Sequence, residues 1–405
     1  MKTLLLLTHA FPYDAGEDFL SAELEQAFGF DRVVLCPCSL EQDSVQTKCL
    51  PPEVQCIPVR RKPLSRAAYL LQLFRPCVMG EIFRLLSTGR FQAVRVHELL
   101  YFMKNATEIY HGLKRNLSAG QKDSVTIYSY WLYDAAAAGV MLAADLRKKG
   151  VAVHQISRAH GFDIHSERSK HGYLPMRTWL FQHIERIFPC SDDGAAVLRK
   201  EAGKEAGKIT RAYLGTRSRS IGKPERLPLH IVSCSYMVPV KRLNLIAEAL
   251  QQADFPIAWT HIGSGPLRQE LLAAADKMPP NVTVEFAGEK KNDDVLEYYK
   301  NTPVSAFVNV SSSEGIPVTI MEAFSFGIPV IATDVGGTHE IVADGRNGFL
   351  LPKDFEPQQL LGLLRRICKM EEEDYRMLCS SARAAWEQNF NAAENYRRFY
   401  SELIS

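Results

Sequence analysis

Short apolar runs alternate with longer segments of helical periodicity throughout the chain. In the first half, the runs that predict buried strands are "LLLLTHA", "RVVLCP", "AVRVH", "VTIYSYW" and "VAVHQISRAHG". The segments between them predict helices over residues 20–28, over 66–86 and along "YDAAAAGVMLAADLRKK". Strands that alternate with helices in this way are typical of a parallel sheet with helices on both faces.

A polar segment rich in turn formers, "GTRSRSIGKPERLP" at residues 215–228, interrupts this alternation. The pattern then restarts with strands at "LHIVSCSY", "IAWTHIG", "VTVEFAG", "VSAFVNVS", "PVIAT" and "GFLL". The helices predicted between these strands cover residues 243–251, 267–275, 293–299 and 317–326. A chain of 405 residues also exceeds the size at which one core keeps growing.

These patterns predict an α/β protein with two doubly wound parallel-sheet domains that face each other across a cleft. The expected boundaries are 1–215 for the first domain, 216–228 for a linker, 229–385 for the second domain and 386–405 for a final helix. Open parallel sheets bind ligands at the carboxyl ends of their strands, so we expect the functional residues there.

The net charge of +2 conceals an asymmetry between the two halves. Residues 1–220 carry 30 Lys and Arg against 22 Asp and Glu, whereas residues 221–405 carry 18 against 24. Eight of the basic residues lie in segment 60–95, which has one acid, Glu81, and two apolar helical patterns. Such a segment suits an anionic membrane surface or a phosphate-bearing partner, and it is equally compatible with a solvated helix packed on a core.

The nine cysteines show no paired spacing that would predict a zinc site or a disulfide framework. Several lie in apolar runs, where a thiol behaves as a small buried hydrophobic side chain. Because no disulfide framework is predicted, a reducing cytoplasm fits best. The leucine run after Lys2 is too short for a signal peptide, and no apolar stretch is long enough to span a bilayer. We therefore expect a cytoplasmic protein, with peripheral contact to the inner face of the cell membrane through segment 60–95 and no nucleic-acid partner.

The stretch "SSSEGIPVTIMEAFSFGIPVIAT" at 311–333 holds two carboxylates, Glu314 and Glu322. The apolar run before it predicts a strand that enters a turn at Gly315, and Pro317 suits the first position of a helix. A helix that begins there would direct its first backbone N–H groups out of the sheet edge, where such groups attract phosphate. Those groups belong to Ile316, Val318 and Thr319.

Beside this anion site, Glu314 is placed to accept hydrogen bonds from sugar hydroxyls, and Glu322 to accept both hydroxyls of a ribose. The apolar neighbours of Glu322 strengthen this interpretation, because a half-buried charge without a partner is costly. The alternative is a helix cap followed by an ordinary surface glutamate. One ligand with a hexose, a diphosphate and a ribose would satisfy both carboxylates and the helix end between them.

The longer stretch "EGIPVTIMEAFSFGIPVIATDVGGTHEIV" closely resembles the signature of the retaining family-four glycosyltransferases, which are nucleotide-sugar-dependent enzymes of the GT-B fold. Four other segments are similar to motifs of the same family, so the resemblance covers nearly the whole chain: "HAFPYDAGEDF", "SRAHGFD", "SYMVPVKR" with "LNLIAEAL", and "HIGSGPLRQEL". The resemblance implies that the first domain binds the acceptor, that the second binds the nucleotide sugar, and that the terminal helix crosses back to the first domain.

The resemblance also implies residue roles. It places Glu322 on the ribose, Glu314 and His160 on the donor sugar as the catalytic candidates, Lys241 on the diphosphate, and Gly16 and Gly263 in turns near the donor. His160 follows a predicted strand, which independently favours a position at the carboxyl edge. The family generally has Arg five residues before the lysine, where this chain has Tyr236, so Arg242 is the candidate for the missing charge.

No Asp-x-Asp sequence occurs, so the ligands of a metal clamp on the leaving group are absent and we predict metal-independent chemistry without a cofactor. The co-substrate would be a nucleotide diphosphate sugar, and by the resemblance the sugar would leave and arrive on one face with retained configuration. The aromatic residues of "YSYWLYD" suit either stacking on an acceptor sugar or core packing.

The leading hypothesis is transfer of a hexose to a glycan or lipid-linked glycan in bacterial-type surface polysaccharide biosynthesis. A sugar-nucleotide 2-epimerase shares the architecture, but it would need further acid-base carboxylates for which the sequence has no clear motif. A catalytically silent scaffold that binds a glycan or a partner enzyme is the third interpretation, and Tyr236 is the feature that favours it.

Overall fold

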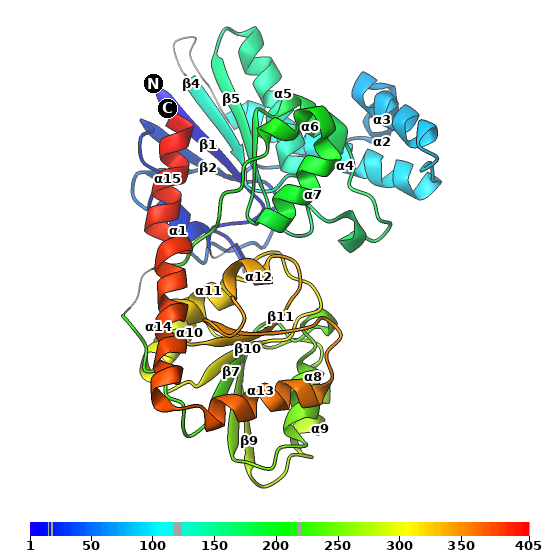
Figure 1. The fold of residues 1–405 in the computed structure, drawn as a ribbon. Helices are drawn as coiled ribbons and strands as arrows, with labels where there is room; N and C mark the ends of the chain where they lie inside the picture. The colour runs from blue at the N-terminus through cyan, green and yellow to red at the C-terminus, as the bar shows by residue number, and fades with distance from the viewer. Residues whose placement is uncertain (15, 18, 117–123, 218–219, 405) are drawn as a thin grey trace. The chain divides into compact units, whose positions relative to one another are not determined.

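The structure, a computed structural model, describes residues 1–14, 16–17, 19–116, 124–217 and 220–404. The chain divides into two compact units, of which unit 1 comprises Met1–Ala212 and Tyr396–Ser405 and unit 2 comprises Tyr213–Asn395. Each unit contains one six-stranded sheet in which the paired strands run parallel, with helices packed on it (Figure 1). The predicted fold class, two doubly wound parallel-sheet domains, is therefore confirmed.

The strands of unit 1 lie in the order β3-β2-β1-β4-β5-β6. They are β1 (Lys2–Thr8), β2 (Arg32–Pro37), β3 (Val54–Cys56), β4 (Ser124–Ser129), β5 (Ala152–Ala159) and β6 (Arg186–Pro189). Leu5 on β1 pairs with Val34 on one side and with Ile127 on the other, and all three side chains are buried. The strand order reverses between β1 and β4, which makes the carboxyl ends of these two strands the expected place for a ligand.

The helices of unit 1 cover its sheet. They are α1 (Leu20–Leu24), α2 (Arg66–Leu70), η1 (Leu71–Phe74), α3 (Pro76–Ser87), α4 (Ala93–Asn116), α5 (Asp134–Lys148), η2 (Ser166–Arg168), α6 (Arg177–His183), α7 (Asp192–Ala202), η3 (Gly203–Lys208) and the end of α15 (Ala392–Ile404). Figure 1 shows α2 and α3 at the margin of the unit, with α4 between them and the strands.

One predicted strand of the first half is wrong. The run "AVRVH" at residues 93–97 is the first part of α4, a 24-residue helix. The alternating valines favour a strand locally. The buried side chains that follow recur with helical spacing, and the helix that they form extends back to include this segment. These side chains are Leu99, Leu100, Phe102 and Met103. The strand that the sheet uses instead is β3, which is only three residues long and lies earlier in the chain.

Unit 2 repeats the topology, with its strands in the order β12-β11-β10-β7-β8-β9. The strands are β7 (His230–Cys234), β8 (Ile257–Ile262), β9 (Val282–Gly288), β10 (Ala306–Asn309), β11 (Val330–Thr333) and β12 (Gly348–Leu351). The helices are η4 (Pro239–Lys241), α8 (Leu243–Leu250), α9 (Arg268–Ala275), α10 (Asn292–Asn301), α11 (Val318–Ser325), α12 (Thr338–Ile341), α13 (Pro357–Lys369) and α14 (Glu372–Asn389). The strand order reverses here between β7 and β10.

A buried ion pair lies beneath the end of α15 in unit 1. The Arg158 Nε and Glu23 Oε2 atoms are 3.6 Å apart, and both side chains are fully buried. Tyr128 bridges them, since its hydroxyl donates to Glu23 at 2.7 Å and accepts from Arg158 Nε at 2.7 Å. From α15, Phe399 lies 4.4 Å from the Arg158 guanidinium and Tyr400 donates to Glu23 at 3.4 Å. This cluster joins the last turns of the chain to β4 and β5.

Parts of two predicted segments lie outside the described residues. The predicted linker includes residues 218 and 219, and the first-loop motif includes residues 15 and 18, all of which lie outside the described residues. Within the described ranges, no helix combines the length and the apolar character that crossing a membrane requires.

Candidate functional site

At the point in unit 2 where the strand order reverses, the loops after β7 and β10 are held together. Lys241, from the first loop, lies with its Nζ 2.7 Å from Glu314 Oε1 on the second. The two backbones also bond, because the Ser312 N–H donates to the Val240 carbonyl at 2.8 Å. Asn309, the last residue of β10, donates to the same Glu314 oxygen at 3.3 Å. An ammonium and a carboxylate thus meet at the carboxyl edge where a ligand is expected.

Glycines allow two more turns to approach the loops after β10 and β7 closely. Gly336 has a φ of +53°, and a Cβ on it would lie 2.1 Å from the Glu314 carbonyl oxygen. The next residue, Gly337, donates its N–H to the Gly315 carbonyl at 2.7 Å. Gly263, at the end of β8, has a φ of +141°, and a Cβ there would lie 1.9 Å from the Ser235 carbonyl oxygen. Both glycines therefore meet a steric requirement of the site, whatever ligand it binds.

Helix α11 starts directly beyond this loop. The helix begins at Val318, one position later than the sequence predicted, and Pro317 is its N-cap residue. Val318 and Thr319 form the first turn, where backbone N–H groups have no acceptor within the helix. Ile316 is buried and anchors the approach to the helix. The predicted strand, tight turn and helix start are therefore present.

Glu322 lies on α11 and is buried to 7% exposure. Its Oε1 accepts a hydrogen bond of 2.6 Å from the Asn292 amide at the start of α10. Burial, followed by the negative charge of Glu322, raises the pKa of the neighbouring Cys234 to about 12, so this thiol stays neutral. The predicted need of Glu322 for a partner is met by Asn292, a residue that the sequence analysis did not select.

Arg242 is placed differently from Lys241. Its guanidinium donates to three backbone carbonyls, those of Val310, Ser311 and Lys353. Its backbone is in the left-handed region at a φ of +48°. These hydrogen bonds hold the end of β10 to neighbouring loops. The Arg242 guanidinium therefore stabilises the backbone around the site. Tyr236, at the position where the family generally has Arg, is exposed.

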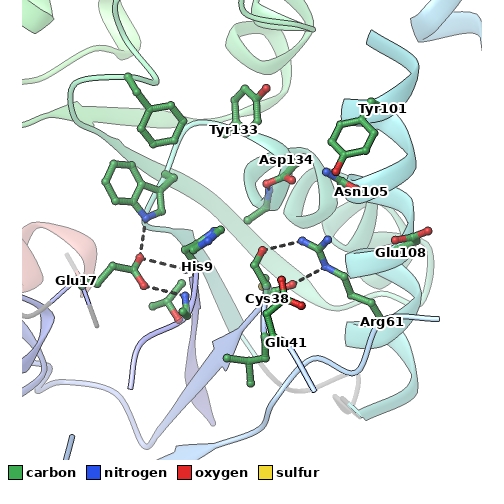
Figure 2. Close-up of a pocket in the computed structure, with 18 of the residues that line it drawn as sticks. His9, Glu17, Cys38, Glu41, Arg61, Tyr101, Asn105, Glu108, Tyr133 and Asp134 are labelled. Carbon is green, nitrogen blue, oxygen red and sulfur yellow. Dashed lines mark hydrogen bonds between the residues drawn. The ribbon is translucent and has the colours of Figure 1, made fainter. Parts of the chain in front are cut away.

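In unit 1, a cavity of about 790 Å³ opens at the carboxyl ends of β1, β2 and β4. Figure 2 shows its polar walls, to which Asp134 contributes from α5, Arg61 from the segment before α2, and Tyr101 and Asn105 from α4. Trp131, Tyr133 and Phe162 supply aromatic walls. Carboxylates, an amide, a guanidinium and aromatic faces in one cavity are the groups that bind sugar hydroxyls and sugar faces.

Glu17 closes one side of this cavity. Its carboxylate accepts hydrogen bonds from the backbone N–H groups of His9, Ala10 and Phe11 at 2.9 to 3.1 Å, and from Trp131 Nε1 at 2.6 Å. The bond to Trp131 fixes the indole in the cavity wall (Figure 2). Gly16, before it, has a φ of +106° and open space where a Cβ would be. The requirement for glycine at this position therefore comes from the backbone conformation.

Arg61 and Asp134 are two of the charged residues that line the cavity, together with Glu17, Glu41 and Glu108. Arg61 donates to the Cys38 carbonyl at 2.6 Å and to Ser39 Oγ at 2.7 Å. Burial raises the pKa of the Asp134 carboxyl, and the Arg61 guanidinium is the strongest opposing influence. A half-buried carboxylate and a fixed guanidinium give the cavity acceptors and donors in set positions.

Known proteins resemble this chain in sequence and in fold. A family model described as glycosyl transferases group 1 matches residues 218–385. WcaL of Salmonella typhimurium, a glycosyltransferase named for colanic acid biosynthesis, is 30% identical over 274 residues, which are 64% of this chain and 67% of that protein. The chain belongs to the glycosyl transferases group 1.

Other relatives of this glycosyl transferase agree. The amylovoran biosynthesis glycosyltransferase AmsK of Erwinia amylovora is 29% identical over 269 residues, which are 64% of this chain and 65% of that protein. The chain thus spans about two thirds of the length of these curated relatives. The Anabaena protein Alr3699/HepE, solved with UDP-glucose, has a TM-score of 0.66 at 15% identity over 99% of both chains. At this identity the structural likeness shows the GT-B fold alone.

His160 of this glycosyl transferase lies behind the cavity wall. It is 8% exposed, stacks on Tyr130 with ring centroids 4.7 Å apart, and contacts Trp131 in a tilted arrangement at 4.6 Å. Its Nε2 is 3.1 Å from the Tyr130 carbonyl oxygen. The cavity is lined by Trp131 and Phe162, and His160 is absent from the described residues that line it. Burial, followed by the charge of Arg158, lowers the pKa of His160 to about 3, so the imidazole is neutral.

The neutral state of His160 predicts a pH dependence of stability. Its ordinary pKa is 6.5 and its folded pKa is about 3, so below pH 6.5 the unfolded chain binds a proton that the folded protein does not. We expect the free energy of unfolding of unit 1 to fall by about 2 kcal/mol from this residue as the pH drops from 7.5 to 5. Urea unfolding at a series of pH values measures this change. In His160→Gln, the free energy of unfolding should fall less steeply with decreasing pH than in the wild type.

Substitution of the exposed His97 by Gln is the matched control and should keep the wild-type slope. If the free energy of unfolding changes equally with pH in the wild type and in both variants, His160 is not a buried neutral residue.

Several residues of this glycosyl transferase that meet at the two sheet edges were missed from the sequence. Asn309 ends β10 and Asp134 follows β4 by a few residues, so their positions after buried strands are a signal that was available. Arg61 and Asn292 have no such signal, because each reaches its site through a loop or helix start that folding brings close. Glu17 lies inside the quoted first-loop motif, where only Gly16 was selected.

Proposed function

We propose that the protein transfers a hexose from a nucleotide diphosphate sugar to a glycan or lipid-linked glycan, with retained anomeric configuration, in the biosynthesis of a bacterial-type surface polysaccharide. The observation that carries the proposal is the Lys241–Glu314 pair where the strand order of unit 2 reverses, beside the start of α11. The colanic acid and amylovoran names of two relatives support a polysaccharide product. A neighbouring structure in complex with UDP-glucose supports a nucleotide sugar donor.

Unit 2 supplies the groups for the donor. In the proposed complex, the first N–H groups of α11 and the Lys241 ammonium bind the diphosphate, because both present positive charge at the sheet edge. Glu314 then accepts from the sugar hydroxyls and Glu322 from the ribose. Glu322 is suited to this role because its buried carboxylate is already oriented by Asn292.

The cavity of unit 1 is the proposed acceptor site. Its aromatic walls suit the apolar faces of a sugar ring, and Asp134 and Asn105 suit hydroxyl groups. Glu17 acts as a positioning residue, because it fixes both the first loop and the Trp131 indole. His160 supports Trp131 from behind as a neutral ring, in addition to the role toward the donor sugar that the family resemblance implies.

In the proposed reaction, the bond between the anomeric carbon and the diphosphate oxygen breaks, and the diphosphate leaves with the electron pair. The acceptor oxygen bonds to the same face of the anomeric carbon, and its proton passes to the departing diphosphate. Lys241 and the α11 start stabilise the charge that develops on the leaving group. We propose that this electrostatic assistance makes the reaction independent of a metal ion.

We place this reaction in the cytoplasm. All nine cysteines are free, including the exposed Cys49, which agrees with a reducing compartment.

A donor screen tests the proposal. Purified protein is incubated with EDTA and a panel of UDP, GDP and ADP sugars, and the released nucleoside diphosphate and the anomeric configuration of slow hydrolysis are measured. We expect nucleoside diphosphate to be released from one donor, with retained anomeric configuration of the sugar. Glu322→Ala should abolish this release. The matched variant Glu297→Ala, on the exposed side of α10, should not change it.

Other outcomes would replace the proposal. An epimerised sugar nucleotide would indicate a 2-epimerase. The absence of both release and thermal stabilisation by every nucleotide would indicate a scaffold without activity.

A further inference from the structure

Six large apolar side chains point into solvent from the consecutive helices α2, η1 and α3. Their exposed fractions run from 54% for Leu86 to 72% for Phe74. We call these residues the outer helical face, which consists of Leu70, Leu71, Phe74, Met79, Phe83 and Leu86. Single exposed apolar residues are ordinary, but a group of six on adjoining helices indicates a surface that meets an apolar partner.

The outward orientation of this face is fixed by the inner side of the same helices. On α3, Val78, Glu81 and Leu85 are buried, whereas Met79, Phe83 and Leu86 are on the opposite side. Glu81 accepts from the Tyr173 hydroxyl at 2.8 Å, and Arg84 donates to it through two bonds of 2.7 and 2.8 Å. The bond from Tyr173 and the burial of Val78 and Leu85 determine which side of α3 faces the unit. The apolar side chains are therefore exposed by the packing of the unit.

Basic residues accompany the outer helical face. Segment 60–95 contains eight Lys and Arg residues and one acid, Glu81, which is buried and paired with Arg84. Lys62, Arg66 and Arg90 are exposed in this segment. The exposed charge that this segment itself carries is therefore positive.

We propose that the outer helical face docks on the surface of a bilayer that contains anionic lipids. The apolar side chains would enter the interface between headgroups and acyl chains, and the basic side chains would contact the phosphate groups of the lipids. A two-fold contact between copies of the chain would bring this positive surface against itself, which is unfavourable. An anionic lipid surface satisfies both the apolar and the basic residues.

This inference goes beyond the proposed transferase activity and is tested without a donor or an acceptor. Purified full-length protein is floated with phosphatidylcholine vesicles that contain either no phosphatidylglycerol or about one third of it. We expect binding to the anionic vesicles alone, weakened by added salt because charge contributes to it. Phe74→Ser combined with Phe83→Ser should lower the partition coefficient at least tenfold, and Arg66→Glu combined with Arg90→Glu should do the same.

Matched control variants carry the same changes elsewhere. Ile221→Ser with Met377→Ser removes exposed apolar side chains from unit 2, and Lys148→Glu with Lys149→Glu reverses charge on α5. Both pairs should bind vesicles like the wild type, and thermal unfolding checks that every variant is folded.

Three outcomes overturn the proposal. The first is no flotation of the wild type with either vesicle. The second is flotation that neither the Phe nor the Arg pair reduces. The third is a dimer by light scattering that the Phe pair dissociates, together with no flotation, which would assign the face to a second copy of the chain.

Discussion

Replacement of Glu314 by Gln is expected to lower sugar transfer by about 10²-fold to 10³-fold while it strengthens the binding of free nucleoside diphosphate by about threefold to tenfold. The two effects have opposite signs because Glu314 binds the sugar of the proposed donor but competes with its diphosphate for Lys241. Its carboxylate accepts from the sugar, so its loss slows transfer. The same carboxylate pairs with the Lys241 ammonium at 2.7 Å, so its neutralisation leaves that positive charge to the diphosphate.

Lys241→Met should weaken both properties, because it removes the cation and leaves the carboxylate. Nucleoside diphosphate binding is measured by titration calorimetry and transfer by product formation with the donor found in the screen. The matched variants Glu297→Gln and Lys300→Met disrupt an exposed ion pair on α10 and should change neither property. If Glu314→Gln and Lys241→Met shift diphosphate affinity in the same direction, the pair is not a competitor of the ligand.

Substitution of Arg158 by Met is expected to destabilise unit 1 by about 3 to 5 kcal/mol. Burial raises the pKa of Glu23 and the Arg158 charge opposes that rise, so loss of the arginine leaves a fully buried carboxyl without its cation. The guanidinium also contacts Phe399 and donates to the Ala212 carbonyl at 2.8 Å. Urea unfolding followed by tryptophan fluorescence measures the change, with Trp131 and Trp179 in unit 1 as reporters.

A second ion pair in unit 1, which is exposed, provides the control. Arg186 and Glu402 join β6 to α15 at 2.8 Å with side chains 38% and 46% exposed, so Arg186→Met should cost less than about 1 kcal/mol. Addition of Glu23→Leu to Arg158→Met should recover most of the lost stability, because it removes the unpaired buried carboxyl. Equal losses for Arg158→Met and Arg186→Met would show that burial does not govern the strength of these pairs.

Local patterns predicted most of the fold and the centre of the unit 2 site. The strands after residue 228 are all present, because each apolar run is bounded by turn residues and favours one structure. The predicted turn at Gly315 and the helix after Pro317 also formed, since strand, turn and helix signals are contiguous there. Where local preference and packing disagreed, as in "AVRVH", packing over the rest of α4 determined the structure.

The sequence by itself determined two parallel-sheet domains and the glutamates of a glycosyl transferase signature, because these depend on periodicity and on short contiguous motifs. Only the tertiary structure decided which groups meet. It paired Lys241 with Glu314 across 73 positions, engaged the donors of Arg242 with backbone carbonyls, and assembled the unit 1 cavity from separate segments. It also turned the apolar side of α3 outward. These features follow from packing between residues distant in the chain, which no local pattern encodes.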